Sequence, residues 1–216
     1  MRRIILCFLA MCAFSSVSLL AVVTPAPAAQ RVVPATPLAV AAYASVLSRI
    51  NPAMPRWQSH FLAKRVLINA ERWRIDATML VAIVTVESRW HTHAVSSAGA
   101  IGLGQLMPGT AALLRVNPRD PGQNLSGAAR YLRGLVGRYG RRRYDLVFAA
   151  YNAGPHAVGE YGGIPPYGET QQYVVRVLST WQELARIIHL PEAAYDTAAT
   201  IHSADAAYWL EDAKTQ

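Results

Sequence analysis

An apolar run that ends in a single carboxylate is the feature that most constrains this chain. The run covers residues 79–86, Asp76 precedes it as a favourable helix N-cap, and Glu87 follows it. Leu80 and Ile83 lie seven and four residues before Glu87, so helical spacing places all three side chains on one face. We therefore expect a buried helix that carries a carboxylate on its inward face.

The carboxylate of Glu87 has few acceptable environments on such a face. Burial of an unpaired charge is costly, so the group must pair with a partner, turn to solvent or keep its proton. A raised pKa would make Glu87 a proton donor near neutral pH. From this segment alone, a solvent-exposed residue in the last helical turn is the simpler interpretation.

A glycine-rich segment follows the predicted helix. Residues 99–108 read Gly-Ala-Ile-Gly-Leu-Gly-Gln-Leu-Met-Pro, and glycine allows close backbone approach or a positive φ. The segment contains neither G-x-G-x-x-G nor Gly-Lys-Ser/Thr, so it does not predict a phosphate-binding loop. The Gln105 amide and the flexible Met107 side chain suit a sugar, which has polar edges and apolar faces.

Three motifs resemble the catalytic core of the soluble lytic transglycosylases. The first contains Glu87-Ser88-x-Trp90 and the glycine-rich segment, and the second is Ala-Ala-Tyr-Asn-Ala-Gly at 149–154. The third is Pro-x-x-Glu-Thr-x-x-Tyr-Val at 166–174. Together the motifs cover residues 57–185 in the order of that family. The resemblance implies an all-α, lysozyme-like catalytic domain, similar to goose-type lysozyme, that acts on peptidoglycan glycan strands without a cofactor.

The resemblance also implies a reaction and a set of site residues. Glu87 would protonate the glycosidic oxygen between N-acetylmuramic acid and N-acetylglucosamine, then accept the proton of the muramoyl C6 hydroxyl. The product would be a 1,6-anhydromuramoyl end formed without water. Seven further residues would bind the substrate: Ser96, Gln105, Met107, Tyr151, Asn152, Glu169 and Tyr173.

Each of these roles has a structural alternative. Tyr151 and Tyr173 fit equally as core aromatic residues with hydroxyls at the surface. Asn152 fits a helix C-terminus, and Glu169 fits a first helical turn, where the helix dipole favours an acid.

Two positions depart from the family pattern. Gly104 stands where the family usually has Met, and Gln171 stands where Arg usually follows the Glu-Thr pair. Neither position is the acid itself. We therefore expect both changes to alter which glycan chains fit the site rather than the reaction.

The acidic residues leave two other functions open. Glycosidases usually employ two carboxylates that flank the bond, yet no second acid lies in a motif typical of a nucleophile. A hydrolytic lysozyme-type muramidase and a non-catalytic peptidoglycan-binding module are the alternatives. Neither requires a cofactor.

The 216 residues suggest one folded domain between two different terminal segments. We expect a signal peptide over 1–29, because Arg2 and Arg3 precede an apolar run and Ala26-Pro27-Ala28 resembles a cleavage site. An uncleaved membrane anchor is the alternative. An Ala/Pro-rich linker over 30–44, a catalytic domain over 45–190 and an Ala-rich tail over 191–216 complete the expected organisation. The chain would then be exported to the periplasm or cell envelope.

Cysteine content and charge narrow the chemistry and the partners. Both cysteines, Cys7 and Cys12, lie in the expected signal peptide, so cleavage would leave no thiol nucleophile. The formal net charge of +8 fits an acidic polymer such as the cell wall. No nucleic-acid motif accompanies the basic run at 141–143, so we expect no nucleic-acid partner. A secretion or division assembly of the envelope remains open as a partner.

Two histidines just after the predicted helix are candidate zinc ligands. His91 and His93 lack a third ligand at motif spacing, so we expect no metal.

Helical periodicity predicts the remaining elements. Helices are expected over 43–50, 56–73, 124–139, 144–152 and 169–189, with Asn124 as the cap of the third and a loop over 156–168.

Overall fold

Seven helices build the part of the chain that the computed structural model describes, residues 33–188. They are α1 (Pro37–Ile50), α2 (Arg56–Trp73), α3 (Ala77–Ser88), α4 (Pro108–Leu113), α5 (Pro121–Tyr139), α6 (Tyr144–Glu160) and α7 (Gly168–Ile187). These described residues contain no strand, and only two isolated bridges pair Ile101 with Val95 and with Leu106. The predicted all-α class is confirmed. No helix in residues 33–188 combines the length and hydrophobicity needed to cross a membrane.

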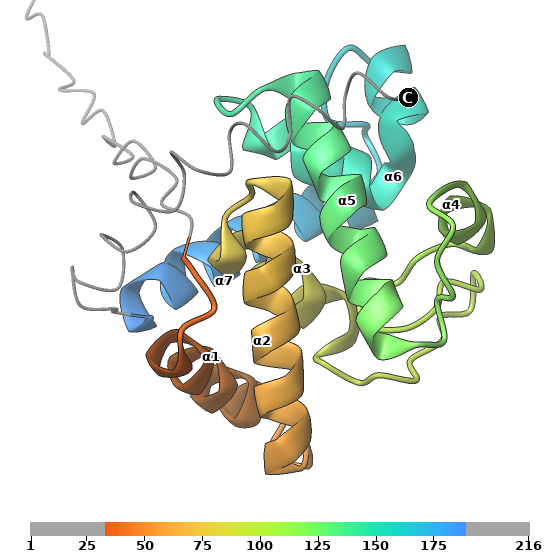
Figure 1. Ribbon diagram of the computed structural model, residues 1–216. Helices are drawn as coiled ribbons and strands as arrows, with labels where there is room; N and C mark the ends of the chain where they lie inside the picture. The colour runs from red at the N-terminus through yellow and green to blue at the C-terminus, as the bar shows by residue number, and fades with distance from the viewer. Residues whose placement is uncertain (1–32, 189–216) are drawn as a thin grey trace, which may run out of the picture.

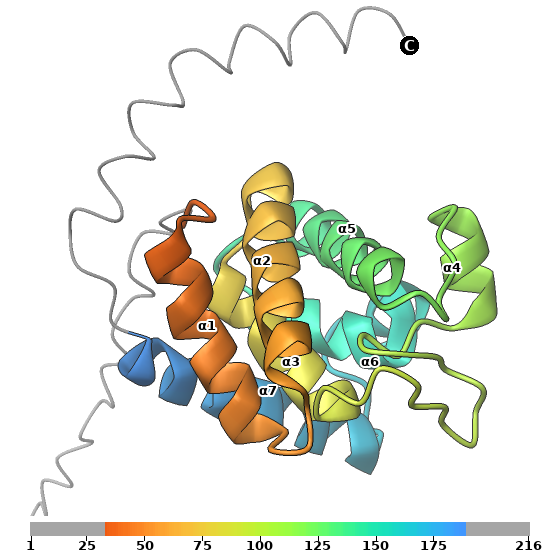
Figure 2. The ribbon, with the colours of Figure 1, turned by 60° about the horizontal axis from the view of Figure 1, so that its bottom comes forward.

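Helix α3 is the central element of the fold. It packs against α2, α5 and α7 (Figures 1 and 2), and every residue from Ala77 to Val84 is buried. The predicted cap is confirmed, because the Asp76 carboxylate accepts the Met79 N–H at 2.9 Å. Arg89 ends the helix in the left-handed conformation at φ 49°. Glu87 therefore lies in the last turn of a buried helix.

The other helices pack in a continuous series around α3. Helix α1 lies on α2, α2 on α5, α5 on α6 and α6 on α7, which returns to α3 (Figure 1). The Trp181 ring of α7 meets Tyr144 and Phe148 of α6 edge-on, with ring centroids 5.0 and 6.1 Å apart. The chain thereby brings its third motif against its first.

An irregular segment, residues 89–107, projects beside α4 and is held by one buried residue of α5. The Asn124 amide donates to the Ile101 and Pro118 carbonyls at 2.7 and 2.9 Å, and its oxygen accepts the Gly104 N–H at 2.7 Å. Asn124 is fully buried, and the prediction that it caps the helix is wrong. Asp120 is the cap, because the Asp-Pro-Gly sequence supplies an acceptor for the Gln123 N–H followed by proline at the first helical position.

The expected linker also differs from the structure. Helix α1 begins at Pro37, where the Thr36 hydroxyl accepts the Ala39 N–H at 3.2 Å, so residues 37–44 are helical rather than extended. Ala39 and Tyr43 are buried in the core, which explains why this alanine-rich stretch folds. The expected signal peptide and tail lie outside the described residues.

The loop predicted from residue 156 is likewise shorter than expected. Gly154 interrupts α6 with φ 85°, and Pro155 then begins a further helical turn that ends at Glu160. Helix α7 starts at Gly168 and ends at Ile187, close to the predicted bounds.

Candidate active site

A hydrogen bond between α3 and α7 defines the candidate site. The Tyr173 hydroxyl donates to Glu87 Oε1 at 2.6 Å, and the Tyr173 side chain is buried. The inward-facing carboxylate expected from the sequence thus has a fixed partner from the third motif.

Burial changes the acidity of Glu87. Desolvation raises the pKa of its carboxyl group from 4.5 to about 7, although the hydrogen bond from Tyr173 acts in the opposite direction. The charge of Glu169 raises the pKa further, and that of Arg176 lowers it. Near neutral pH the group is therefore present in both protonation states, as a proton donor and acceptor requires.

The three residues of α7 that influence Glu87 share one helix face. Glu169, Tyr173 and Arg176 stand at i, i+4 and i+7, and the two charged residues are exposed on either side of the buried tyrosine. Arg176 was missed at the sequence level, although its helical spacing from Glu169 could have identified it.

Tyr151 is held close to the glycine-rich segment. Its hydroxyl donates to the Gly104 carbonyl at 3.0 Å, and its ring packs on Tyr131 with centroids 5.4 Å apart. Burial, and then the charge of Glu87, raise the pKa of the Tyr151 hydroxyl well above its ordinary value. Tyr151 is thus a packed aromatic residue close enough to Glu87 to sense its charge.

Close packing accounts for the glycine at position 104. A Cβ on Gly104 would lie 2.6 Å from the Cβ of Ala128 and 3.0 Å from the Tyr151 hydroxyl. The methionine that the family usually carries would not fit here unless α5 or Tyr151 moved.

Ser96, Gln105 and Met107 lie together in the irregular segment but make different contacts. The Ser96 hydroxyl accepts the Ala100 N–H at 3.0 Å, and the Gln105 amide donates to the carbonyls of Ala94 and Gly102 at 3.2 and 2.9 Å. These bonds shape the segment. Met107 is 45% exposed and leaves an apolar surface open.

Asn152 connects the second motif to the third. Asn152 follows Tyr151 in the sequence, and its side-chain oxygen accepts a hydrogen bond from the Thr170 hydroxyl at 2.7 Å. The structure thus joins Glu87 with Tyr173 and Asn152 with Thr170, while Glu169 stays exposed nearby.

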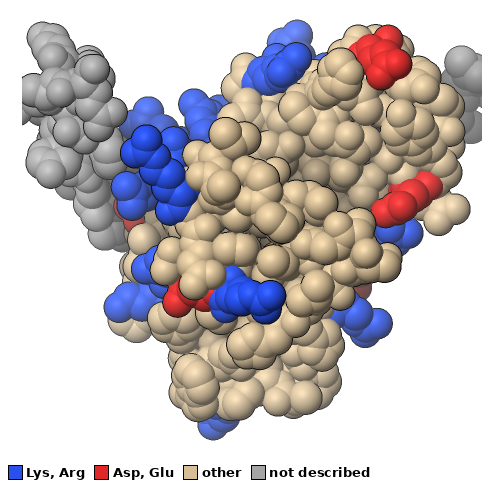
Figure 3. All heavy atoms as spheres, turned by 90° about the vertical axis from the view of Figure 1, so that its right-hand side faces the viewer, with Lys and Arg blue, Asp and Glu red and all other residues tan. Residues whose placement is uncertain are grey.

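Figure 3 shows a broad uncharged area on the face of the molecule that it draws. Within residues 33–188, no group of three His, Cys, Asp or Glu side chains is arranged to hold a metal ion.

Comparisons with known proteins identify the family of this chain. The family model described as "Transglycosylase SLT domain" matches residues 65–174, about half of the chain. Membrane-bound lytic murein transglycosylase F of Cellvibrio japonicus is 31% identical over 154 residues, which cover 65% of this chain and 30% of that protein. The transglycosylase of Enterobacteria phage PRD1 is 39% identical over 84 residues, which cover 38% and 31%.

A solved structure supports the fold. An inactive mutant of lytic transglycosylase Slt from Pseudomonas aeruginosa superposes with a TM-score of 0.54 at 24% identity, covering 72% of this chain and 31% of the other. The chain thus spans about a third of the length of each of these proteins. Because the family match covers half of the chain and includes Glu87, Tyr151 and Tyr173, the chain belongs to the transglycosylase SLT domain family.

Proposed function

We propose that this protein is a lytic transglycosylase that cleaves the β-1,4 bond between N-acetylmuramic acid and N-acetylglucosamine in peptidoglycan. The observation that carries the proposal is the Glu87–Tyr173 pair, in which a half-buried carboxyl group with a pKa of about 7 accepts a hydrogen bond from a buried tyrosine. Family membership and the names of the relatives support the same substrate.

In the proposed reaction, Glu87 serves first as acid and then as base. Protonated Glu87 gives its proton to the glycosidic oxygen, and the bond from that oxygen to C1 of the muramoyl sugar breaks. The C6 hydroxyl oxygen of the same sugar then bonds to C1, and its proton returns to Glu87. The products are a free 4-hydroxyl on N-acetylglucosamine and a 1,6-anhydromuramoyl end, with no water consumed.

The other candidate residues would hold the glycan around this acid. Met107 offers an exposed apolar surface, and Glu169 offers an exposed carboxylate near Glu87. Ser96 and Gln105 would act both by shaping the irregular segment and through their remaining hydrogen-bonding capacity. Tyr151 would hold the glycine-rich segment, Asn152 would hold the start of α7, and Tyr173 would position the acid.

A hydrolytic muramidase is the second candidate function. Glu169 favours it, because this is the other carboxylate whose charge reaches Glu87, and a second carboxylate could activate water. The proposed route is preferred because Glu169 is exposed in the first turn of α7, a position where the helix dipole favours an acidic residue even without a specific role.

Mass spectrometry of the soluble products from purified peptidoglycan tests both candidates. We expect anhydro-ended muropeptides from the wild-type chain and from Glu183→Gln, an exposed control on α7, and none from Glu87→Gln. Reducing ends, each heavier by one water, would instead identify a muramidase. Wall binding by wild type and Glu87→Gln without any cleavage would identify a binding module.

We further propose that the protein works in the cell envelope, in the periplasm or attached to the membrane. The substrate lies there, and one relative is named as membrane-bound. A single catalytic domain that includes α1, and association with a secretion or division assembly of the envelope, are part of this proposal.

A further inference from the structure

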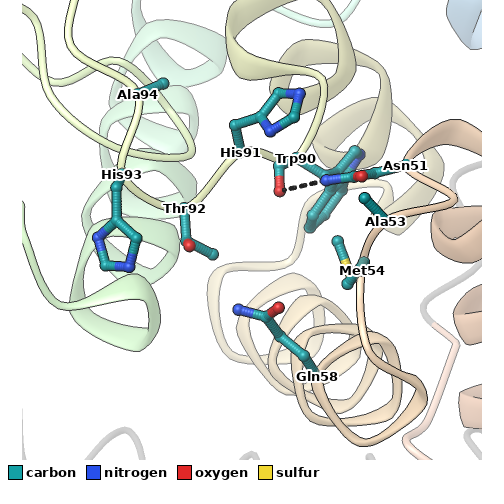
Figure 4. A pocket seen from close by; sticks show the side chains of 9 residues that line it. All are labelled: Asn51, Ala53, Met54, Gln58, Trp90, His91, Thr92, His93 and Ala94. Carbon is teal, nitrogen blue, oxygen red and sulfur yellow. Dashed lines mark hydrogen bonds between the residues drawn. The ribbon is translucent and has the colours of Figure 1, made fainter.

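A pocket of about 430 Å³ lies between the turn that joins α1 to α2 and the loop that follows α3. Four residues between positions 51 and 58 form one wall, and residues 90–94 form the other (Figure 4). None of the eight candidate site residues lines it. Its volume is in the range of small-molecule sites.

Uncharged polar groups face the pocket from both walls. Figure 4 places the Thr92 side chain on the loop side and the Gln58 amide on the α2 side of the same space. Among contacts within residues 33–188, no hydrogen bond engages either side chain, so both can bind a ligand. The lining contains His91 and His93 but no Asp, Glu, Lys or Arg, so it offers no permanent charge to an anion or a charged peptide, which favours a neutral ligand.

The base of the pocket is apolar and rigid. Met54 and Trp90 are buried there, and the Trp90 indole donates to the Thr85 hydroxyl of α3 at 3.0 Å. Asn51 donates to the Trp90 carbonyl at 3.3 Å and ties the two walls together. The pocket is therefore preformed, which lowers the entropy cost of binding.

Two exposed aromatic residues of α2 flank Gln58 in the sequence. Trp57 and Phe61 are 70% and 47% exposed, and they share one face of α2 at i and i+4. Gln58 follows Trp57 in sequence and, at a spacing of three residues, shares a helix face with Phe61. Aromatic faces beside neutral hydrogen-bonding groups match a pyranose ring, which has apolar C–H faces and polar edges.

We propose that this pocket binds one N-acetylhexosamine ring of a glycan strand, at a position separate from the Glu87 site. The identity of the sugar rests on the proposed function. The loop that forms one wall continues directly from α3, and its Ala94 carbonyl accepts the Gln105 amide. A glycan strand bound in this pocket would thus contact the irregular segment 89–107, which carries Ser96, Gln105 and Met107.

Binding by a chain that cannot cleave tests the proposal. The full chain with Glu87→Gln is titrated with the tetramer of N-acetylglucosamine while the indole N–H signals are followed by NMR. We expect the Trp57 signal to shift and the Trp73 signal to stay. Gln58→Leu and Thr92→Val should each weaken tetramer binding about threefold to tenfold, the effect of one lost hydrogen bond. Gln182→Leu, an exposed substitution on α7, should bind unchanged.

The outcomes separate this inference from the proposed function. With Glu87 intact, Gln182→Leu should release the same anhydro products as wild type. The pocket assignment would be overturned by an unmoved Trp57 signal, or by tetramer binding of both pocket variants equal to that of Gln182→Leu. If the wild type still cleaved peptidoglycan, the proposed function would stand. A shifted Trp57 signal without any cleavage by wild type would support the pocket and overturn the transglycosylase. Circular dichroism confirms that each variant is folded.

Discussion

The Tyr173 hydroxyl donates to Glu87 Oε1 at 2.6 Å, and this bond joins two residues that lie 86 positions apart in the sequence. It connects the last turn of α3 to the second turn of α7. The acid is therefore oriented by the packing of two helices and not by a flexible loop, which suits a group that must donate one proton and then accept another.

The pH dependence of cleavage should report the pKa of Glu87. Because the first step needs the protonated acid and its pKa is about 7, kcat/KM should be level below pH 7 and fall above it, by about tenfold per pH unit. Release of soluble products at constant ionic strength measures this profile. A rate that stays level from mildly acidic to alkaline pH would contradict the assignment of Glu87 as the acid.

Removal of the Tyr173 hydroxyl should move this profile to higher pH. The hydrogen bond stabilises the ionised carboxylate and so lowers its pKa, hence Tyr173→Phe should shift the alkaline limb upward by about one pH unit or more. Tyr139→Phe is the matched control, since the Tyr139 hydroxyl donates to the Pro155 carbonyl instead. Equal profiles for the two variants would show that the Tyr173 bond does not tune the acid.

The two exposed charges on α7 should move the profile in opposite directions. Glu169→Gln removes a charge that raises the pKa of Glu87, so the limb should move to lower pH, and Arg176→Gln should move it to higher pH. Because both groups are exposed, added salt should shrink both shifts. Kinetics at low and at high ionic strength check the prediction, and shifts of the same sign in both variants would refute it.

Substitution of the acid should stabilise the protein at alkaline pH. The pKa of Glu87 rises from 4.5 when unfolded to about 7 when folded, so the folded state binds the proton more tightly between these values. Stability that depends on this proton is complete below pH 4.5 and is lost as pH rises through about 7. Relative to wild type, Glu87→Gln should therefore gain up to about 3 kcal/mol in free energy of unfolding above pH 7.

Urea denaturation at acidic and alkaline pH measures this difference. The gain should be small at pH 4 and present at pH 8. A difference between the two proteins that does not change with pH would mean that burial leaves the acidity of Glu87 unaltered.

Much of this arrangement could be predicted from local sequence, because helix α3 follows from an N-cap and an apolar run. The direction of Glu87 followed from helical spacing, but its bond to Tyr173 depends on how α7 packs, which no local pattern records. Asn124 illustrates the limit. Its position near a helix start suggested a cap, whereas its side chain binds two backbone groups of the glycine-rich segment and the Pro118 carbonyl.

The early start of α1 shows a second limit. Composition suggested a linker over 30–44, because alanine and proline are common in linkers. Both residues also occur at helix starts, so composition alone does not separate the two. What decides the conformation is the burial of Ala39 and Tyr43 against the rest of the core, a tertiary effect that outweighs local composition.

Any side chain at position 104 should destabilise the protein. A Cβ there would lie 2.6 Å from the Cβ of Ala128, so Gly104→Ala should lower the free energy of unfolding by about 1–3 kcal/mol. Gly109→Ala is the matched control, because a Cβ at Gly109 meets no atom within 4 Å. Thermal or urea unfolding of both variants provides the measurement.

The partner side of the contact supplies a second check. Ala128→Gly removes the atom that the new Cβ would strike, at a cost of about 1 kcal/mol for glycine inside helix α5. If the clash is the cause, the double variant should lose less stability than the sum of the two single losses. Additive losses would mean that position 104 is limited by something other than the approach of α5, and the explanation given for its glycine would fail.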